Sequence, residues 1–239
     1  FEDGRWTPQV EWAFAKWAVD DVLQVRLGRL RPAVYMLSDY LDVNYSNAWV
    51  RPPIEFYSSA PLMRMEGVDL LWTPVTGEWS WLVQPYLGRS DLSMPNQIEL
   101  EVRDILGLNL SASRGDWTLR AGHLSTALTV DAPMLSQAFD GLAALCANGM
   151  GDPAACTQGS ALRAKGKRST FTSVGASWDN GDAFVTAEWG SRSSDSYIAD
   201  ASTGYLSAGL RRGKWTPYLT YATFQNRSPT RYAGSTDHP

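Results

Sequence analysis

Five short turns divide this chain into alternating runs, and this repeat limits its fold more than any other feature. The turns lie at residues 20–21, 76–79, 114–117, 180–182 and 212–215. Each is flanked by two runs of about ten residues in which apolar side chains alternate with polar or small ones. The far ends of the runs open into long polar connections. Tight turns at one end and long connections at the other predict a sheet whose two ends face different compartments.

The third hairpin shows the alternation most clearly. Leu106, Leu108 and Leu110 share one face of its first strand, and Asn109 lies on the other. An arginine in mid-strand, such as Arg26, costs roughly 2–4 kcal/mol if it faces hydrocarbon at the bilayer midplane. We therefore expect the aliphatic faces to contact lipid and the polar faces to line a water-filled lumen. The polar faces carry Gln24, Arg26, Asp69, Gln84, Asn109, Arg120, Glu188 and Arg211.

Alternation alone does not distinguish the inside of a barrel from its outside. The orientation rests on the tryptophans beside the short turns, the even strand lengths and the unequal lengths of the connections. Together they predict an all-β, antiparallel up-and-down transmembrane β-barrel with about ten visible strands, short periplasmic turns and long extracellular loops. In this interpretation residues 1–239 form one barrel domain, which lies in the lipid of the bacterial outer membrane.

Composition narrows the remaining classes. The chain is 44% apolar, but no stretch approaches the roughly 18 apolar residues of a spanning helix. Eleven Trp and ten Tyr fit the aromatic belts of a barrel. The net charge is −4 and no run of Lys or Arg suggests nucleic acid. His123 and His238 lie in unrelated contexts, so neither a metal nor another cofactor is expected.

Five connections are predicted to be long and to share one end of the barrel. They are residues 31–66, 89–104, 123–170, 191–204 and 225 onward. Within 123–170, apolar residues at helical spacing from Met134 to Leu145 predict a short amphipathic helix. Cys146 and Cys156 follow it, ten residues apart, and a local disulfide is favoured in an extracytoplasmic loop.

The 31–66 connection is rich in aromatic residues and proline, whereas a flexible loop would be rich in Gly, Ser and Asn. We expect it to fold inward against the barrel wall and narrow the pore. Its charged residues have an alternative role, which is only to pin the segment to the wall. The candidate pore-lining residues are Arg26, Arg29, Arg31, Asp39, Tyr40, Asp42, Tyr45, Arg51, Glu55, Tyr57, Arg64, Glu66 and Arg120.

Most of the chain resembles a known family, most strongly over residues 11–90 and less so around Cys146 and Cys156. The residues that carry the resemblance read LGRLRP at 27–32, SDYLDV at 38–43, WVRPPIEFY at 49–57 and GVDL at 67–70. They resemble proteobacterial trimeric-type porins and, more loosely, phosphate-selective porins. The resemblance implies a homotrimeric channel for passive diffusion of small hydrophilic solutes or ions, with about sixteen strands per barrel. Lysine is scarce, which does not support selectivity for phosphate.

Both ends of the chain interrupt the repeat. Phe1 begins within an alternating run, and Pro239 ends in a polar stretch. We therefore expect the chain to be part of a longer barrel that is incomplete at both ends.

Three other classes compete with a porin. An enzyme is not expected, because the chain has no Gly-x-Ser-x-Gly motif and no Ser/His or Asp/His pairing, so no catalytic residue is assigned. A secreted, soluble lectin-like protein would use the tryptophans beside the turns to stack on sugars. A structural or adhesive barrel would span the membrane without a pore. Heat-modifiable mobility in detergent separates the lectin from the barrels, and ion conductance separates the two kinds of barrel.

Overall fold

A computed structural model describes residues 10–38, 49, 51–60, 62–94, 98–153, 156, 165–196 and 198–227. One antiparallel sheet holds every strand of this part of the chain. Its strands are β1 (Ala13–Ala18), β2 (Leu23–Leu30), β3 (Met65–Trp72), β4 (Val75–Thr76), β5 (Trp79–Met94), β6 (Ile98–Arg114), β7 (Trp117–Asp131), β8 (Lys167–Asp179), β9 (Ala183–Ser194), β10 (Ala201–Leu210) and β11 (Tyr218–Asn226). The helices are α1 (Ile54–Tyr57) and α2 (Pro133–Ala147).

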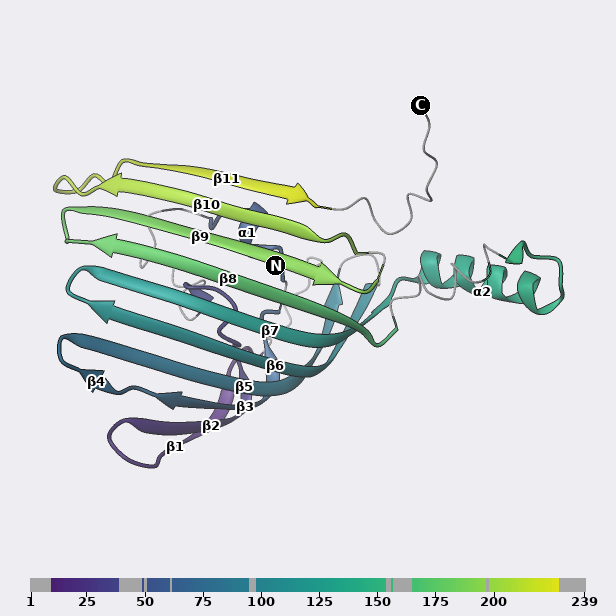
Figure 1. The fold of residues 1–239 in the computed structure, drawn as a ribbon, viewed down its shortest axis with the longest axis horizontal. Helices are drawn as coiled ribbons and strands as arrows, with labels where there is room; N and C mark the ends of the chain where they lie inside the picture. The colour runs from purple at the N-terminus through teal and green to yellow at the C-terminus, as the bar shows by residue number, and fades with distance from the viewer. Residues whose placement is uncertain are drawn as a thin grey trace.

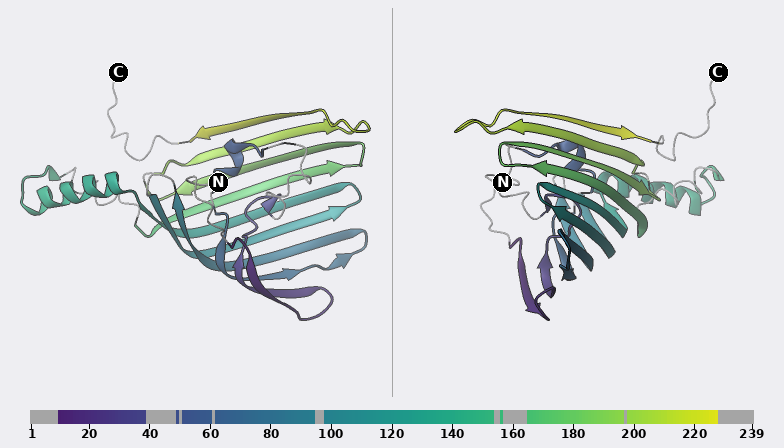
Figure 2. Two further views of the ribbon diagram at one scale, coloured as in Figure 1. Left: turned by 180° about the vertical axis from the view of Figure 1, so that it is seen from behind. Right: turned by 60° about the vertical axis from the view of Figure 1, so that its left-hand side comes forward.

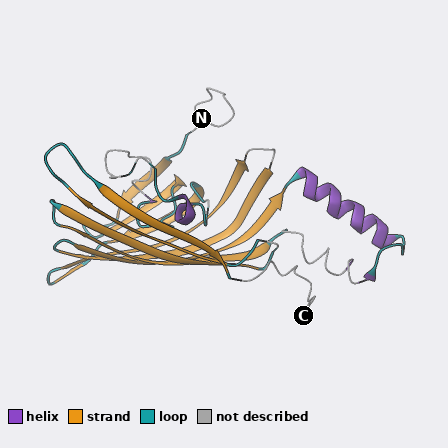
Figure 3. Ribbon diagram, turned by 90° about the horizontal axis from the view of Figure 1, so that it is seen from above, coloured by secondary structure: helices purple, strands orange, loops and turns teal. Residues whose placement is uncertain are grey.

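The strands follow one another in an up-and-down order. Ten of them run β1-β2-β3-β5-β6-β7-β8-β9-β10-β11, and the two-residue β4 pairs only with β5. The all-β, antiparallel up-and-down fold predicted from the sequence is confirmed. The sheet is strongly curved, and α1 lies on its concave side (Figures 1 and 3). The described residues do not close a barrel, because β1 and β11 form the two edges and do not pair with each other.

All the short turns gather at one end of the sheet (Figures 1 and 2). Gly115 has a φ of 55°, and with Asp116 it makes a two-residue hairpin turn that requires this left-handed conformation. Asn180 closes another turn, since its Oδ1 accepts hydrogen bonds from the backbone N–H groups of Asp182 and Ala183. The fifth turn is longer than predicted, because β11 begins at Tyr218 and only an isolated bridge joins Arg212 to Trp215.

The two faces of the sheet separate aliphatic from polar side chains. Leu106 is 62% exposed and Leu206 is 51% exposed on the convex face, whereas Asp69 and Glu188 are 2% and 3% exposed on the concave face. Other large apolar side chains exposed on the convex face include Leu27, Leu87, Leu108, Leu110, Leu119, Val174, Trp189, Leu219 and Tyr221. In the part of the sheet nearer the short turns the predicted orientation is confirmed, because aliphatic side chains cover the outside and polar ones such as Asp69 and Glu188 face inward.

The central strands are longer than the sequence analysis predicted. Residues 89–94 and 98–104 belong to β5 and β6, and β7 continues to Asp131. The prediction of long connections at 89–104 and 191–204 was therefore wrong, and the 123–170 connection is shorter than expected. The strand pairing of β9 and β10 also leaves only residues 195–200 between them.

The cause of this error is an inversion of the alternating pattern along the strands. In the extensions, charged residues such as Arg89 and Glu101 are exposed on the outer face, and Leu100, Val102 and Leu124 are buried on the inner face. Irregular pairing between Arg103 and Leu106, with a positive φ at Asp104, accompanies the change in β6. A pattern with apolar residues outside and polar residues inside ends there, although the strand itself continues.

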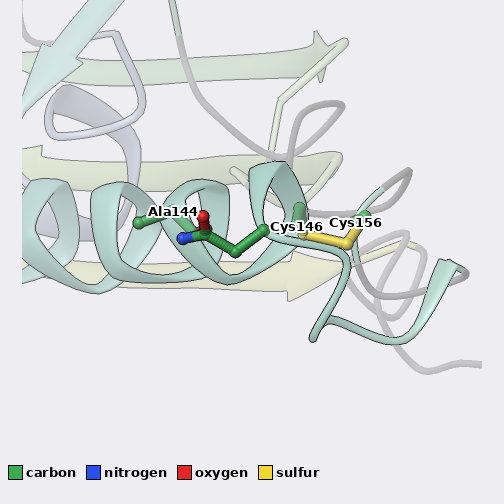
Figure 4. Close-up of a disulfide and its surroundings, with 4 residues drawn as sticks. Ala144, Cys146 and Cys156 are labelled. Atoms are coloured by element: carbon green, nitrogen blue, oxygen red, sulfur yellow. A yellow bond between two sulfur atoms is a disulfide. The ribbon is translucent and has the colours of Figure 1, made fainter.

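The connection between β7 and β8 contains α2, which extends away from the sheet (Figure 1). Pro133 stands at its first turn, where its missing N–H is tolerated. A disulfide joins Cys146 to Cys156 across a Cα–Cα distance of 5.8 Å (Figure 4). Gly151 allows the chain to pass close by, since a Cβ there would lie 2.8 Å from the Cys156 sulfur. No helix among the described residues is long and apolar enough to cross a membrane.

The outward face of β6 generates a prediction about insertion. Leu110 and Ser111 are neighbours on opposite faces, with Leu110 inside the aliphatic belt. We expect Leu110→Arg to destabilise the folded state in lipid by about 2 kcal/mol, because the guanidinium would face hydrocarbon. Ser113→Arg, on the same inner face as Ser111 but opposite Thr118 rather than Arg120, is the matched control and should change stability much less. Urea titration in lipid vesicles, followed by heat-modifiable gel mobility, measures both. Equal losses in the two variants would contradict the assignment of the faces.

Candidate functional site

The chain that follows β2 lies against the concave face of the sheet. Its described parts, residues 31–38, 49 and 51–60, are here called the inner segment. Tyr35 ties the two main parts of the inner segment together, because its hydroxyl donates to the Ala60 carbonyl (3.0 Å) and accepts from the Ala60 N–H (2.7 Å). Burial raises the pKa of Tyr35, so the phenol stays protonated and can make both bonds. The inner segment is thus an ordered unit.

Glu188 of β9 is the main polar attachment of the inner segment. Its Oε2 accepts a hydrogen bond from the Met36 backbone N–H (2.9 Å). Its Oε1 accepts hydrogen bonds from the hydroxyls of Tyr57 (2.9 Å) and Tyr205 (2.8 Å). Burial and the nearby Glu188 carboxylate raise the pKa of Tyr57, which keeps this phenol protonated as a donor. Three donors therefore satisfy a carboxylate that water does not reach.

Arg120 of β7 forms a second attachment. Its Nη2 donates to the Ala33 carbonyl (2.6 Å), and its Nη1 donates to Ser173 Oγ (3.1 Å) on the neighbouring strand. A third attachment comes from β10, where Thr203 Oγ1 donates to the Glu55 carbonyl (2.6 Å). Strands β7 to β10 thus hold the backbone of the inner segment at several points.

An aromatic cluster fills the contact between the inner segment and the wall. Phe56 is fully buried, with ring centroids 5.3 Å from both Tyr35 and Tyr205, and Tyr35 lies 5.6 Å from Phe171. Gly190 makes room for this packing, since a Cβ there would lie 2.6 Å from the Phe171 ring. Such edge-to-face pairs add about 0.5–1.5 kcal/mol each beyond the burial of their surface. The contact is therefore both apolar and hydrogen-bonded.

A polar row crosses the inner wall on β2, β3, β5 and β6. The Nε of Arg26 donates to Asp69 Oδ1 (2.9 Å), and its Nη2 donates to Asp69 Oδ2. Gln84 Nε2 donates to Asp69 Oδ2 (2.8 Å), and Asn109 Nδ2 lies 3.5 Å from Gln84 Oε1. The guanidinium of Arg26 also lies over the ring of Phe14. This row keeps charged and amide groups on the side of the sheet opposite the aliphatic belt.

The structure separates the candidate pore-lining residues into several places. Arg31 and Arg120 are buried between the inner segment and the wall, and Arg31 Nη1 donates to the Ser38 carbonyl (3.2 Å). Arg51 and Glu55 are exposed on the inner segment, and Arg64 is half-buried. Asp39, Tyr40, Asp42 and Tyr45 lie outside the described residues.

Arg29 and Glu66 correct the expectation that they line a pore. They pair with each other at 2.7 Å and continue the row of Leu27 and Val68, with Arg89 beside Glu66 on the next strand. The adjacent pair, Leu30 and Met65, is buried on the concave side, which places Arg29 and Glu66 on the convex side. They mark the end of the aliphatic belt.

Glu188 and the aromatic residues on the wall were not among the candidate site residues. Glu188 was recognised as inward-facing, but its partners lie 17 to 152 residues away in the sequence, so alternation could not reveal them. The inward glycines of β8 and β9 were the available signal. A Cβ on Gly175 would lie 2.9 Å from the Glu188 side chain and 3.0 Å from Met36. Small residues on an inner wall indicate that another part of the chain packs there.

The site offers positioning and charge rather than evident bond-making chemistry. Among the residues that the structure describes, no three His, Cys, Asp or Glu side chains group as metal ligands would. His123 is exposed, and its Nδ1 lies 2.8 Å from Thr172 Oγ1. The expectation that the chain is not an enzyme remains a prediction.

Comparisons with known proteins add little to this description. No family model and no curated protein matches the sequence. Structures of the outer-membrane protein OmpT of Vibrio cholerae are similar at 8% identity and a TM-score of 0.41, covering 87% of this chain and 68% of that one. A mutant of the same protein that lacks loop L8 is 9% identical with a TM-score of 0.41, and the match covers 89% of this chain and 84% of that one. The in-vitro folded protein is 9% identical with a TM-score of 0.40, and the match covers 89% of this chain and 78% of that one. Scores this low carry no functional argument.

The convex surface of the sheet indicates which medium surrounds the chain. Its convex face carries a belt of exposed leucines and aromatic residues, and tryptophans such as Trp72, Trp117 and Trp215 lie near the short turns. A sheet can place such a face in lipid only where its backbone groups are hydrogen-bonded between strands, as they are in a β-barrel. The chain is an outer-membrane β-barrel protein. Its short turns and its long connections lie at opposite ends of the membrane-spanning part.

The attachment at Glu188 generates a second prediction. We expect Glu188→Gln to lower stability by about 1–3 kcal/mol, because the amide would present donors to Met36 N–H or to the tyrosine hydroxyls, leaving a buried donor without an acceptor. Thermal unfolding in detergent measures the change. Glu78→Gln is the control, since Glu78 is an exposed turn residue that pairs with Arg114. An unchanged melting temperature for Glu188→Gln would contradict this role.

Proposed function

We propose that this protein is an outer-membrane channel for passive diffusion of small hydrophilic solutes or ions. The observation that carries the proposal is the inner wall, where Arg26, Asp69, Gln84 and Asn109 form a hydrogen-bonded row opposite a lipid-facing surface. Charged and amide groups on a membrane wall are stable when they face water or one another. A barrel closed around such a wall would enclose a water-filled path.

The inner segment supplies the narrowing of this path. It is anchored to β7, β8, β9 and β10 through Arg120, Ser173, Glu188 and Thr203. Its exposed charges, Arg51 and Glu55, are available to solutes, whereas its buried ones hold it in place. Charged residues on an inward-folded segment set selectivity through their field across the pore.

A closed channel needs pairing partners for β1 and β11. Unpaired backbone groups in hydrocarbon cost several kcal/mol each, so both edges must be paired in the membrane. A barrel of about sixteen strands, assembled as a homotrimer, remains our proposal for the complete protein. The lectin-like alternative is disfavoured, because the face that carries the tryptophans near the short turns also exposes leucines such as Leu119 and Leu210.

Planar-bilayer recording of the full-length protein tests the proposal directly. We expect discrete, voltage-independent conductance steps that scale with salt concentration. A protein that inserts and shows heat-modifiable mobility but passes no current would overturn the channel and favour a structural or adhesive barrel.

Two arginines of β2 generate a prediction about selectivity. Arg26 lies on the inner wall beside Asp69, and Arg29 lies on the outer face beside Glu66. We expect Arg26→Gln to shift the reversal potential in a salt gradient toward cation preference, because the Asp69 charge is no longer neutralised. Arg29→Gln is the matched control on the same strand and should leave the reversal potential unchanged. Equal shifts would show that the potential does not report the inner wall.

A further inference from the structure

A cavity of about 350 Å³ lies between the inner segment and the extended ends of the central strands. Pockets for small organic ligands are typically about 300–1,000 Å³. Most of its wall is apolar and comes from β5, β6, β7 and β8. The principal apolar lining residues are Leu62, Leu92, Leu100, Leu124, Leu128 and Phe171. Such a lining differs from the polar row that crosses β2 to β6 nearer the short turns.

Arg192 of β9 is the one charged side chain among the described residues that line this cavity. Its Nη1 donates to the Ser59 carbonyl (3.1 Å) and its Nη2 to the Ala199 carbonyl (3.2 Å). Its Nε is buried and has no hydrogen-bond partner among the described residues. A guanidinium has five N–H donors, so these two bonds leave donor capacity unused.

The charge of Arg192 is also not neutralised by its hydrogen bonds. Both acceptors are neutral carbonyls. The guanidinium carbon of Arg192 lies over the ring of Phe224, 5.8 Å from the ring centroid. Asp200 attracts the guanidinium through space but forms no ion pair with it, and its Oδ1 accepts a hydrogen bond from the Ser194 N–H (2.9 Å). A fixed positive charge in an apolar wall favours an anion, because electrostatic interactions strengthen where water is excluded.

We propose that this cavity binds a small amphipathic monoanion, namely a monocarboxylate with an aliphatic body. The carboxylate would interact with Arg192, and the hydrocarbon would contact the leucines of the central strands. The two oxygens of a carboxylate match the planar donor array of arginine, and a carboxylate can carry an aliphatic body for the leucines. The binding site rests on the cavity alone, whereas its use in uptake rests on the proposed channel.

Other ligand classes fit this lining less well. An alkyl cation would meet the Arg192 charge, and a second carboxylate would lack a partner, since the described lining holds no second cation. A sugar needs many polar partners, and the described wall offers a few hydroxyls, including Ser58, Thr126 and Ser169. An alkyl monocarboxylate satisfies both the charge and the apolar surface.

Calorimetric titration of the full-length protein in lipid nanodiscs tests the site. The probes are octanoate, acetate and octyltrimethylammonium, each corrected by titration into empty nanodiscs of the same lipid. We expect saturable octanoate binding at least tenfold tighter than binding of either other probe. Equal binding of octanoate and octyltrimethylammonium would overturn the proposal, as would the absence of saturable octanoate binding.

Three variants connect the binding to the cavity. Arg192→Met keeps the apolar stem and should weaken octanoate binding at least tenfold. Arg227→Met is the matched control, because Arg227 lies over Trp189 and bonds to Ser191 on the outer face. Leu128→Trp fills the cavity from the wall without removing a bond to the inner segment, and it should abolish binding. Octanoate binding that survives both Arg192→Met and Leu128→Trp would overturn the proposal.

Bilayer recording separates this proposal from the channel. If the protein passes no current but binds octanoate through Arg192, the channel is excluded and the binding site stands. If it conducts but binds all three probes equally, the channel stands and the site is excluded. If both proposals hold, octanoate should reduce the current in a saturable manner, and Arg192→Met should remove that effect.

Discussion

The separation of the two faces of the sheet is the physical constraint on which the rest of the structure depends. A strand that crosses lipid must present apolar side chains outward, and period-two alternation then turns every intervening residue inward. The inward residues of this chain include Asp69, Gln84, Asn109, Arg120 and Glu188. Each must find a hydrogen-bond partner or water, because an unpaired charge in a low-dielectric wall is strongly destabilising. The outward apolar residues thus leave inward polar residues that need hydrogen-bond partners or water.

The inward polar groups of the wall find hydrogen-bond partners in two ways. On β2 to β6, inward groups bond to one another across the strands, as Arg26, Asp69 and Gln84 do. On β7 to β10, they bond instead to the inner segment, as Arg120 does with the Ala33 carbonyl and Glu188 with the Met36 N–H. The inner segment therefore supplies hydrogen-bond partners to the buried polar groups of the wall, and the same bonds hold the inner segment in place.

This mutual dependence explains why the attachment is partly apolar. Hydrogen bonds between buried groups contribute only about 1 kcal/mol each to stability, since water would satisfy the same groups. The aromatic cluster around Phe56 adds apolar burial and excludes water from the Glu188 carboxylate. Its rings fit because Gly190 leaves space on the wall. An inner segment held by polar contacts alone could exchange them for hydrogen bonds to water at little cost in free energy.

Much of the fold could be predicted from the sequence, because a strand in lipid must alternate apolar outward residues with inward ones. The alternation of Leu106, Asn109 and Leu110 revealed the strand and its faces, and the turns at Gly115 and Asn180 revealed the hairpins. The site was less readable, because its contacts join residues far apart, such as Met36 and Glu188. Arg29 was misplaced for a related reason. Its position near the inner segment suggested the lumen, but its register with Glu66 and Arg89 places it outside, where the aliphatic belt ends.

In the proposed channel, the inversion of the pattern in the extended strands would affect transport. Beyond the aliphatic belt the outer face meets water, so charged residues such as Arg89 and Glu101 belong there and the inner face is free to become apolar. A solute entering from the end with the long connections therefore meets Leu100 and Leu124 before it meets Arg26 and Asp69. A fully hydrated solute gains nothing from the first zone, because its polar groups lose water there without finding partners. An anion with an apolar body, as we propose, would gain from both the leucines and Arg192 and would be held beside the inner segment. In the proposed channel the order of the two zones would thus favour amphipathic anions by concentrating them at the entrance rather than by fitting them in the narrowest part.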